Sequence, residues 1–483
     1  MRSLLLVLLI VCACSGAGNV VPPGDDDDPD GAVTPAVDAS VADAMIDDAL
    51  PGDPDAGGPD AMPPPVDDPA HLFDLQLPGV HHFDISMDPA DWQWLKTHAL
   101  LEQYKPCTIT FEGRTWSNVA IRFKGDFGTL YSCFDDAGNQ VCPKLSIKLK
   151  FNEYDNDGRF YSMRRLNFNS SVRDQSEMRE VITYSLFRGM GLPAPRASHA
   201  TLSVNGDPQG LFVMVEDLDK EYIQDHWTMD EGNLYKAVWP QWTDADMYRS
   251  ALDTNEGATT DVSRMLQLQQ AIAQSTDATF PANVAGKIDL QHLARYLAVD
   301  RATRNIDSIR TFRCFDDTQT AEDCINGNYY WYEVPNGPTE LLVWDVDLSL
   351  QIWDSDLGRS YWDPDPYDCQ PTPYCVYFGQ SDCVPEETNV WILAPQCNTF
   401  YGLLHRATWG NYLDALDELA HGPMALATLL PKMNMVRTRI GPSVMTDPYG
   451  PTYDDWQHAN HWVDQVLDHQ LDEIDILLAE QQQ

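Results

Sequence analysis

Two aspartates at the end of an apolar run are the residues of this chain best placed to do chemistry. Asp345 and Asp347 follow Leu341-Leu-Val-Trp344, a run typical of a buried strand. Because alternate residues of an extended chain share a face, both carboxylates are expected to point to one side. Carboxylate oxygens placed in this way suit a hard cation such as Mg²⁺.

Polar residues upstream complete the set of groups used in metal-dependent phosphoryl transfer. Asp307 lies in Asn305-Ile-Asp307-Ser308, and Asn328 begins an alternating aromatic run. Phosphoryl transfer uses one acid to orient the attacking hydroxyl, and an amide with a second acid to hold the metal on the phosphates. Asp-x-Asp at a strand end is also common in turns and structural cation sites, so the neighbouring residues must decide.

Two lysines are candidates for contacting a phosphate. Lys148 lies in Lys144-Leu-Ser-Ile-Lys148-Leu-Lys150, whose strict alternation places the polar side chains on one face of a strand. Lys124 precedes Gly125 and Gly128, whose small size allows a loop to approach phosphates closely. The strand position favours Lys148, and both lysines stay open.

The surrounding elements are β-rich at first and helical later, which indicates a mixed α/β (α+β) fold. Hydrophobic periodicity and turn residues predict strands at 80–85, 107–111, 119–123 and 145–151, a short helix begun by Asp88-Pro89, and a hairpin turning at Asn205-Gly206. The same patterns predict helices over 176–190, 403–419, 424–440 and 454–478.

The first 14 residues predict an export signal. Arg2 precedes an apolar run, Leu4 to Val11, that is too short to span a membrane. Val11-Cys12-Ala13-Cys14 is similar to a bacterial lipoprotein box, which implies cleavage before Cys14, acylation of its thiol, and anchoring to a bacterial outer membrane or cell surface. The alternative is an ordinary secretory signal that is cleaved nearby.

Residues 15–75 are predicted to be a disordered linker. Residues 15–70 contain no Lys, Arg or aromatic residue, but they contain 14 Asp and 11 Pro. Such a segment cannot bury enough apolar surface to offset its ordering entropy, and its like charges repel one another. It is expected to hold the folded part away from the membrane.

The charge of the chain argues against nucleic acid as a partner. The formal net charge is −43, and most of this excess remains after the 14 linker aspartates are set aside. An acidic surface repels the phosphate backbone of nucleic acids and the headgroups of anionic lipids. A nucleotide would need a local basic pocket, and Lys and Arg concentrate between residues 122 and 196.

The cysteines are consistent with an exported protein. Cys133 and Cys142, like Cys314 and Cys324, bracket short polar loops, a spacing typical of disulfide-closed hairpins. Residues 353–400 carry four more cysteines, which predicts a disulfide-rich insertion. Nine cysteines lie after Cys14, and this odd number leaves one thiol free.

Residues from about 80 to 355 resemble the spore coat protein H (CotH) family of atypical secretory protein kinases. The matching segments, in chain order, are Ile121-Arg-Phe-Lys-Gly125, Gly191-Leu-Pro-Ala-Pro195, Val204-Asn-Gly206, Gly232-Asn-Leu-Tyr-Lys-Ala237, Asn305-Ile-Asp307, Asn328-Tyr-Tyr-Trp-Tyr332 and Trp344-Asp-Val-Asp347. The ordered set is specific, although each segment alone is not.

The resemblance implies a kinase-like fold with two lobes, a β-rich lobe over residues 76–240 and a mainly helical lobe over 241–483. It also implies ATP with Mg²⁺ or Mn²⁺ as cofactors and Ser or Thr of exported proteins as the acceptor. The expected roles, by residue, are Asp307 as catalytic acid, Asp345 and Asp347 as metal ligands, Asn328 as a metal ligand or loop-fixing amide, and Asn305, Lys124 or Lys148, and Glu180 or Glu216 on the nucleotide side.

Two departures from the family pattern bear on activity. The glycine loop has Asp126-Phe-Gly-Thr129 in place of a small polar residue followed by Ser, and a second insertion, Arg313 to Ile325, separates Asp307 from Asn328. A surface binding or structural protein without catalysis on the same fold therefore stays as an alternative. A less favoured alternative is a phosphoester hydrolase that uses the same acids.

Overall fold

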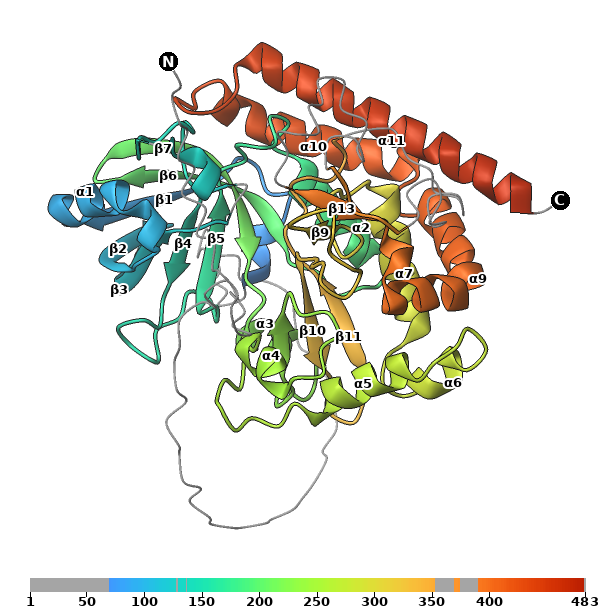
Figure 1. Cartoon of the computed structure of the whole chain (residues 1–483). Coiled ribbons are helices and arrows are strands. Elements are labelled where there is room, and N and C mark those ends of the chain that lie inside the picture. Colours follow the sequence, from blue (N-terminus) through green and yellow to red (C-terminus); the bar gives the residue numbers. More distant parts are fainter. Residues whose placement is uncertain (1–68, 127–128, 136, 352–368, 374–389, 482–483) are drawn as a thin grey trace, which may run out of the picture.

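The computed structural model describes residues 69–126, 129–135, 137–351, 369–373 and 390–481 (Figure 1). The expected signal peptide with Cys14, nearly all of the linker, two residues of the glycine loop and much of the insertion at 353–400 lie outside these ranges. Among the described residues, no helix combines the length and the apolar composition needed to cross a bilayer.

Seven strands close into a barrel in the order β1-β2-β3-β4-β5-β7-β6. The parallel pairing of β1 with β6 closes the barrel, and the other neighbours are antiparallel. The strands are β1 (His81–Met87), β2 (Lys105–Phe111), β3 (Arg114–Phe123), β4 (Ile147–Lys150), β5 (Arg165–Asn169), β6 (Ala197–Val204) and β7 (Asp207–Glu216). The predicted strands are therefore present, and a barrel was not foreseen.

Alternating apolar residues fill the barrel. On β1, Phe83 and Ile85 point inward, and Phe83 stacks on Phe111 with ring centroids 4.4 Å apart. The short 3₁₀ helix η1 (Pro69–Phe73) adds Leu72 to this core, and its carbonyl accepts a hydrogen bond from Ser198 at 2.7 Å. The described structure begins at residue 69, inside the predicted linker of 15–75, and Leu72 and Phe73 are buried there.

Local sequence signals explain the turns and helix starts at the barrel. Asp88 caps α1 (Pro89–Thr97) by accepting the amide of Ala90 at 2.7 Å, with proline at the first helical position as predicted. Asn205 and Gly206 both have positive φ, 52° and 84°, as a two-residue type I′ hairpin turn requires. The predicted hairpin of β6 and β7 is confirmed.

The rest of the chain is mainly helical, with a second and larger core. Figure 1 shows α7, α9, α10 and α11 on the side of the molecule away from β2 and β3. The helices beyond β7 are α3 (Lys220–His226), α4 (Ala245–Ser250), α5 (Ser263–Ala273), α6 (Phe280–Val284), α7 (Leu290–Ala302), α9 (Thr399–His421), α10 (Leu426–Val444) and α11 (Tyr453–Gln481). The three predicted C-terminal helices are confirmed with slightly different bounds, and the whole is a mixed α+β fold.

Two small sheets and one helix connect these parts. The first sheet has the order β11-β10-β8, with β8 (Leu234–Lys236), β10 (Tyr329–Glu333) and β11 (Thr339–Val343). The second has the order β12-β13-β9, with β9 (Phe312–Cys314), β12 (Thr372–Pro373) and β13 (Trp391–Leu393). Helix α2 (Arg179–Gly189) is buried almost throughout and belongs to the larger core.

Three disulfides join cysteines within the described ranges. Cys133–Cys142 and Cys314–Cys324 confirm the two predicted loop closures, and Cys369–Cys397 joins a residue within the insertion to the 3₁₀ helix η6 (Pro395–Cys397) that precedes α9. Among the described cysteines, Cys107 is free and buried.

Candidate active site

The end of β11 meets helix α2, and this junction positions the two strand-end aspartates. The amide of Asp345 donates to the hydroxyl of Tyr184 at 2.9 Å, and the hydroxyls of Thr183 and Ser349 are 2.6 Å apart. Both α2 residues are fully buried, so the helix face that holds the Asp345 loop cannot shift without disturbing the core.

Two of the candidate ligands have a strained backbone. Asp345 has φ of 51° and Asn328 has φ of 64°, in the left-handed region that side chains with a Cβ seldom occupy. The carbonyl of Asn328 accepts the amide of Trp344 at 3.2 Å, which joins the two strained segments. Strain of this kind persists only where the surroundings impose it, and it concentrates at functional sites.

Lys124, at the end of β3, lies beside α2. Its Nζ donates to Oδ1 of Asn169 at 3.1 Å, and Nδ2 of Asn169 donates to Glu180 at 2.8 Å. The same ammonium lies 5.5 Å from the centre of the Trp344 ring. Asn169 therefore bridges Lys124 and Glu180 through one amide.

The electrostatics of this cluster are unusual because carboxylates outnumber cations. Burial, and after it the charge of Asp345, raise the pKa of Glu180 to about 8, although the charge of Lys124 opposes both effects. Burial lowers the pKa of Lys124, against the pull of Asp345. Burial also raises the pKa of Asp345, and it raises that of Asp347 to well above the ordinary range, where the charge of Asp345 adds to the effect.

The oxygen atoms of Asp345, Asp347 and Asn328 are of the kind that binds a divalent cation, but they do not form a complete coordination shell. No group of three or more His, Cys, Asp and Glu side chains within the described ranges is arranged to hold a metal ion. Asp345 and Asp347 supply hard oxygens whose mutual repulsion a cation would relieve. Asn328 donates through Nδ2 to the carbonyl of Asp307 at 2.9 Å, so its amide oxygen is not used in that bond.

Asp307 lies on the loop between α7 and β9. One carboxylate oxygen is 3.2 Å from Nη1 of Arg313, and its backbone carbonyl is held by Asn328. Asn305 is buried, and it supports this loop through its side chain to the amide of Asp307 at 3.4 Å and through its carbonyl to Arg310. In this structure Asn305 thus stabilises the loop that carries Asp307.

The candidate lysines and glutamates that the sequence left open have different contacts in the structure. Lys148 is buried and pairs with Asp217 at 3.1 Å, whereas Lys124 is the lysine whose charge reaches both Glu180 and Asp345. Glu216 binds the guanidinium of Arg196 through both carboxylate oxygens, away from this cluster. The preference for Lys148 from its strand position stays a prediction; its ammonium contacts Asp217, and the charges of both residues also act on Lys124.

Several residues of the site were not foreseen. Tyr184 and Asn169 hold the cluster through hydrogen bonds, and Arg313 pairs with Asp307. Lys236, which is exposed, contributes positive charge at Asp345. The signal for Lys236 was its place in Gly232-Asn-Leu-Tyr-Lys236, and the signal for Asn169 was the alternation along β5, whereas nothing local identifies Tyr184.

Two hollows of the described structure lie away from this cluster. One of about 630 Å³ is lined by residues of the α5–α6 connection and the start of α9, including Arg406 and Asp277. Another of about 440 Å³ lies at one end of the barrel, beside His81 and Glu112. Neither hollow is lined by Asp307, Lys124 or Asp345. The candidate site is therefore identified by the chemistry of its side chains and not by the size of a cavity.

The observations define a protein of mixed α+β fold in which a half-buried lysine lies beside crowded strand-end acids. A model of the CotH kinase protein family matches residues 121–469, well over half of the chain. The chain belongs to the CotH kinase protein family. Membership suggests an atypical protein kinase, a transferase that uses ATP.

Two solved structures are similar to the chain. A Helicobacter pylori proinflammatory kinase, CtkA, has 13% identity and a TM-score of 0.29, with 74% of this chain and 95% of that chain covered. The Shewanella oneidensis MR-1 toxin–antitoxin proteins HipA and HipB, solved with operator DNA, match with 12% identity and a TM-score of 0.26, over 65% of this chain and 60% of that chain. No curated protein sequence matches.

Proposed function

We propose that this protein transfers the γ-phosphate of ATP to Ser or Thr hydroxyls of exported proteins, using Mg²⁺ or Mn²⁺. The observation that carries the proposal is the junction of α2 with the end of β11, where Tyr184 holds the amide of Asp345 and Glu180 lies in the field of Lys124 and Asp345. Membership of the CotH kinase protein family supports the reaction class. A two-lobed kinase arrangement, with the nucleotide between the barrel and the helical part, belongs to the same proposal.

Each side chain has a distinct task in this proposal. Lys124 supplies the positive charge that faces the phosphates, and Glu180, through Asn169, keeps it in place. Asp345, Asp347 and the amide oxygen of Asn328 would hold the metal. When bound, the metal neutralises charge on the β and γ phosphates. Asp307 accepts the proton of the substrate hydroxyl and orients it for attack.

Transfer of label from γ-phosphate-labelled ATP tests the proposal, with the protein itself and co-exported proteins as acceptors. Asp345→Asn should abolish both the metal-dependent rise in melting temperature with ATP and the transfer. Asp307→Asn should keep the nucleotide-induced rise and reduce transfer on the order of 10²-fold or more. Both substitutions are close to isosteric, so denaturation curves without ligand should overlay that of the wild type.

Three outcomes would count against the proposal. An ATP-induced rise in melting temperature that is unchanged by EDTA would remove the role of Asp345 as a metal ligand. Wild-type transfer in both variants would remove the assigned roles. No transfer by the wild type with any divalent metal, combined with intact ATP binding, would favour a binding protein, and release of free phosphate without a labelled acceptor would favour a hydrolase.

We also propose that the protein is exported and anchored to a bacterial membrane through an acylated Cys14. The sequence around Cys14 and the acidic linker that follows support this localisation. Wild-type protein should enter the detergent phase in phase separation, and Cys14→Ser should remain in the aqueous phase or stay unprocessed. A wild-type protein that stays aqueous, with its N-terminus at another residue, would indicate an ordinary secretory signal.

A further inference from the structure

The insertion between Asp307 and Asn328 places a cation against the candidate catalytic acid. Nη1 of Arg313 lies 3.2 Å from Oδ1 of Asp307, and the two side chains are 37% and 29% exposed. An ion pair this exposed adds little to stability. It does, however, occupy one carboxylate oxygen and leave the other for a substrate hydroxyl.

The backbone of Arg313 is held on both sides. Its amide and carbonyl exchange hydrogen bonds with Ile325 at 2.7 and 2.9 Å, and β9 pairs Arg313 with Ile392 of β13. The next residue, Cys314, is joined to Cys324, and both are almost fully buried. Arg313 therefore starts from a backbone position with little freedom.

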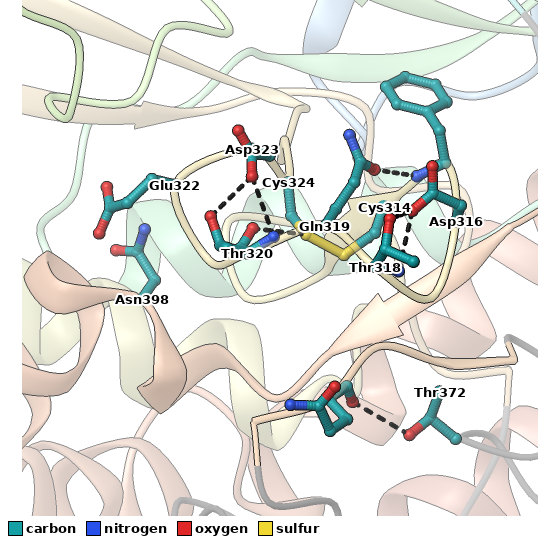
Figure 2. The surroundings of a disulfide bond; sticks show 12 residues. Cys314, Asp316, Thr318, Gln319, Thr320, Glu322, Asp323, Cys324, Thr372 and Asn398 are labelled. Carbon is teal, nitrogen blue, oxygen red and sulfur yellow. Dashed lines mark hydrogen bonds between the residues drawn. A yellow bond between two sulfur atoms is a disulfide. The ribbon is translucent and has the colours of Figure 1, made fainter.

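The loop closed by this disulfide is held by its own side chains (Figure 2). Asp316 accepts the amide and the hydroxyl of Thr318 at 2.8 and 2.6 Å. Asp323 accepts the amide and the hydroxyl of Thr320 at 3.0 and 2.6 Å. Short turns of this kind keep the loop ordered without a hydrophobic core. The disulfide fixes this ordered loop to the end of β9.

Gly327 leaves room for the guanidinium. A Cβ on Gly327 would lie 2.9 Å from Nη2 of Arg313. The following residue, Asn328, donates to the carbonyl of Asp307 at 2.9 Å. Arg313 and Asn328 thus hold Asp307 from two sides, one at the carboxylate and the other at the backbone.

We propose that Arg313, fixed by the loop that Cys314–Cys324 closes, is a positioning residue that aligns the Asp307 carboxylate for the acceptor hydroxyl. This inference rests on the proposed kinase function. It assigns to the insertion a role in catalysis, and it predicts that moving the guanidinium affects the transfer step rather than nucleotide binding.

The main experiment compares Arg313→Ala with Arg313→Lys. In Arg313→Ala the kcat for transfer should fall about 10- to 100-fold, as expected when a reacting group is misaligned, with KM for ATP unchanged. Arg313→Lys should recover only part of kcat, because an ammonium cannot reproduce the planar guanidinium. Added guanidinium ion should raise the activity of Arg313→Ala but not of wild type. Arg406→Ala, which breaks an exposed pair with Asp277 at 2.8 Å, is the matched control and should leave kcat unchanged.

Two further variants probe the support of Arg313 without removing it. Gly327→Ala should displace the guanidinium of Arg313, because the end of a flexible side chain moves more easily than the backbone. This displacement should lower kcat, as Arg313→Ala does. The double variant Cys314→Ser with Cys324→Ser should also lower kcat, while the ATP-induced rise in melting temperature persists. Retention of wild-type kcat in the serine variant would overturn the role of the disulfide.

The remaining outcomes distinguish this inference from the proposed function. If wild type transfers phosphate and Arg313→Ala keeps kcat within about twofold, the positioning role is wrong and the kinase function stands. If Arg313→Ala changes only KM for ATP, Arg313 contacts nucleotide instead, and the inference is again wrong. If wild type transfers nothing, both proposals fall together.

Discussion

A half-buried lysine just after β3, Lys124, and a buried lysine on β4, Lys148, have opposite electrostatic surroundings. Lys148 on β4 pairs with Asp217 at 3.1 Å, and Asp217 also accepts from Asn167 and lies 3.6 Å from Arg165. Lys124 at the end of β3 donates to the neutral Asn169, while Glu180 and Asp345 act on it from a greater distance. One lysine has its charge matched by direct contact, and the other lies in a field of carboxylates.

This difference helps to distinguish a charged residue that stabilises the fold from one that binds a ligand. A matched pair leaves nothing for a ligand to neutralise, and removing one partner leaves a buried charge behind. A cluster with surplus negative charge is costly in the free protein and becomes favourable when a cation arrives. We therefore expect Lys148 to serve the scaffold and Lys124 to serve the candidate site.

The largest effect on activity should come from Lys124. Lys124→Ala should lower phosphate transfer by about 10³-fold or more, because it removes a fixed charge that faces the transferred group. The melting temperature without ligand should fall by less than in Lys148→Met, because Lys124 offsets the charges of Glu180 and Asp345 without a direct carboxylate contact in the described part of the chain. Labelled transfer and thermal unfolding on the same preparation measure the two effects.

The largest effect on stability should come from Lys148. Lys148→Met should destabilise the protein by about 3 kcal/mol, because the Asp217 carboxylate stays buried with weaker partners. Chemical denaturation measures this loss, and the double variant with Asp217→Asn should recover part of it. If Lys148→Met instead abolished transfer in a fully folded protein, the two lysines would have to exchange roles.

Most of the fold was predictable because it depends on local patterns. The Asn205-Gly206 turn, the Asp88-Pro89 cap and the period of α9 to α11 are all encoded within a few residues. The barrel was missed, since its closure depends on the pairing of β1 with β6, more than 100 positions apart. The strand-end acids were identified from type and spacing, but the choice between Lys124 and Lys148 required their partners, which come from distant parts of the chain.

A third test measures how the stability of the protein depends on pH through a buried histidine outside the candidate site. His199 on β6 is fully buried, and its Nε2 lies 2.5 Å from the carbonyl of Glu177, so this nitrogen carries the proton of a neutral ring. Burial lowers the pKa of His199 to about 4. Because the unfolded chain takes up this proton near pH 6.5, stability should be full above that pH and fall as the pH drops from about 6.5 to 4.

Replacement of His199 by Gln isolates this contribution. The wild-type free energy of unfolding should fall by about 3 kcal/mol more than that of His199→Gln between pH 7 and pH 4. Burial raises the pKa of the neighbouring Glu177 to about 7, which gives the opposite slope, but that slope is common to both proteins and cancels in the difference. Parallel curves would show that His199 is protonated in the folded state.

The smallest effects distinguish the two glutamates, and they should have opposite signs. Because burial raises the pKa of Glu180 to about 8, its ionisation opposes folding as the pH rises from about 4.5 to 8. Glu180→Gln removes this cost, so in EDTA at pH 8 the variant should be as stable as wild type or more stable. Its phosphate transfer should nevertheless fall about 10-fold, because Asn169 and Lys124 lose the carboxylate that orders them.

Glu216→Gln is the matched substitution outside the cluster. It breaks the two-oxygen contact with Arg196, so it should lower stability by about 1–2 kcal/mol and leave transfer per folded molecule unchanged. Denaturation curves and labelled transfer give a change in stability and a change in activity for each variant, and the direction of each change is predicted. If Glu216→Gln lost transfer while Glu180→Gln kept it, the cluster on α2 would not be the active site, because the charge that orders the phosphate-facing lysine would then come from β7.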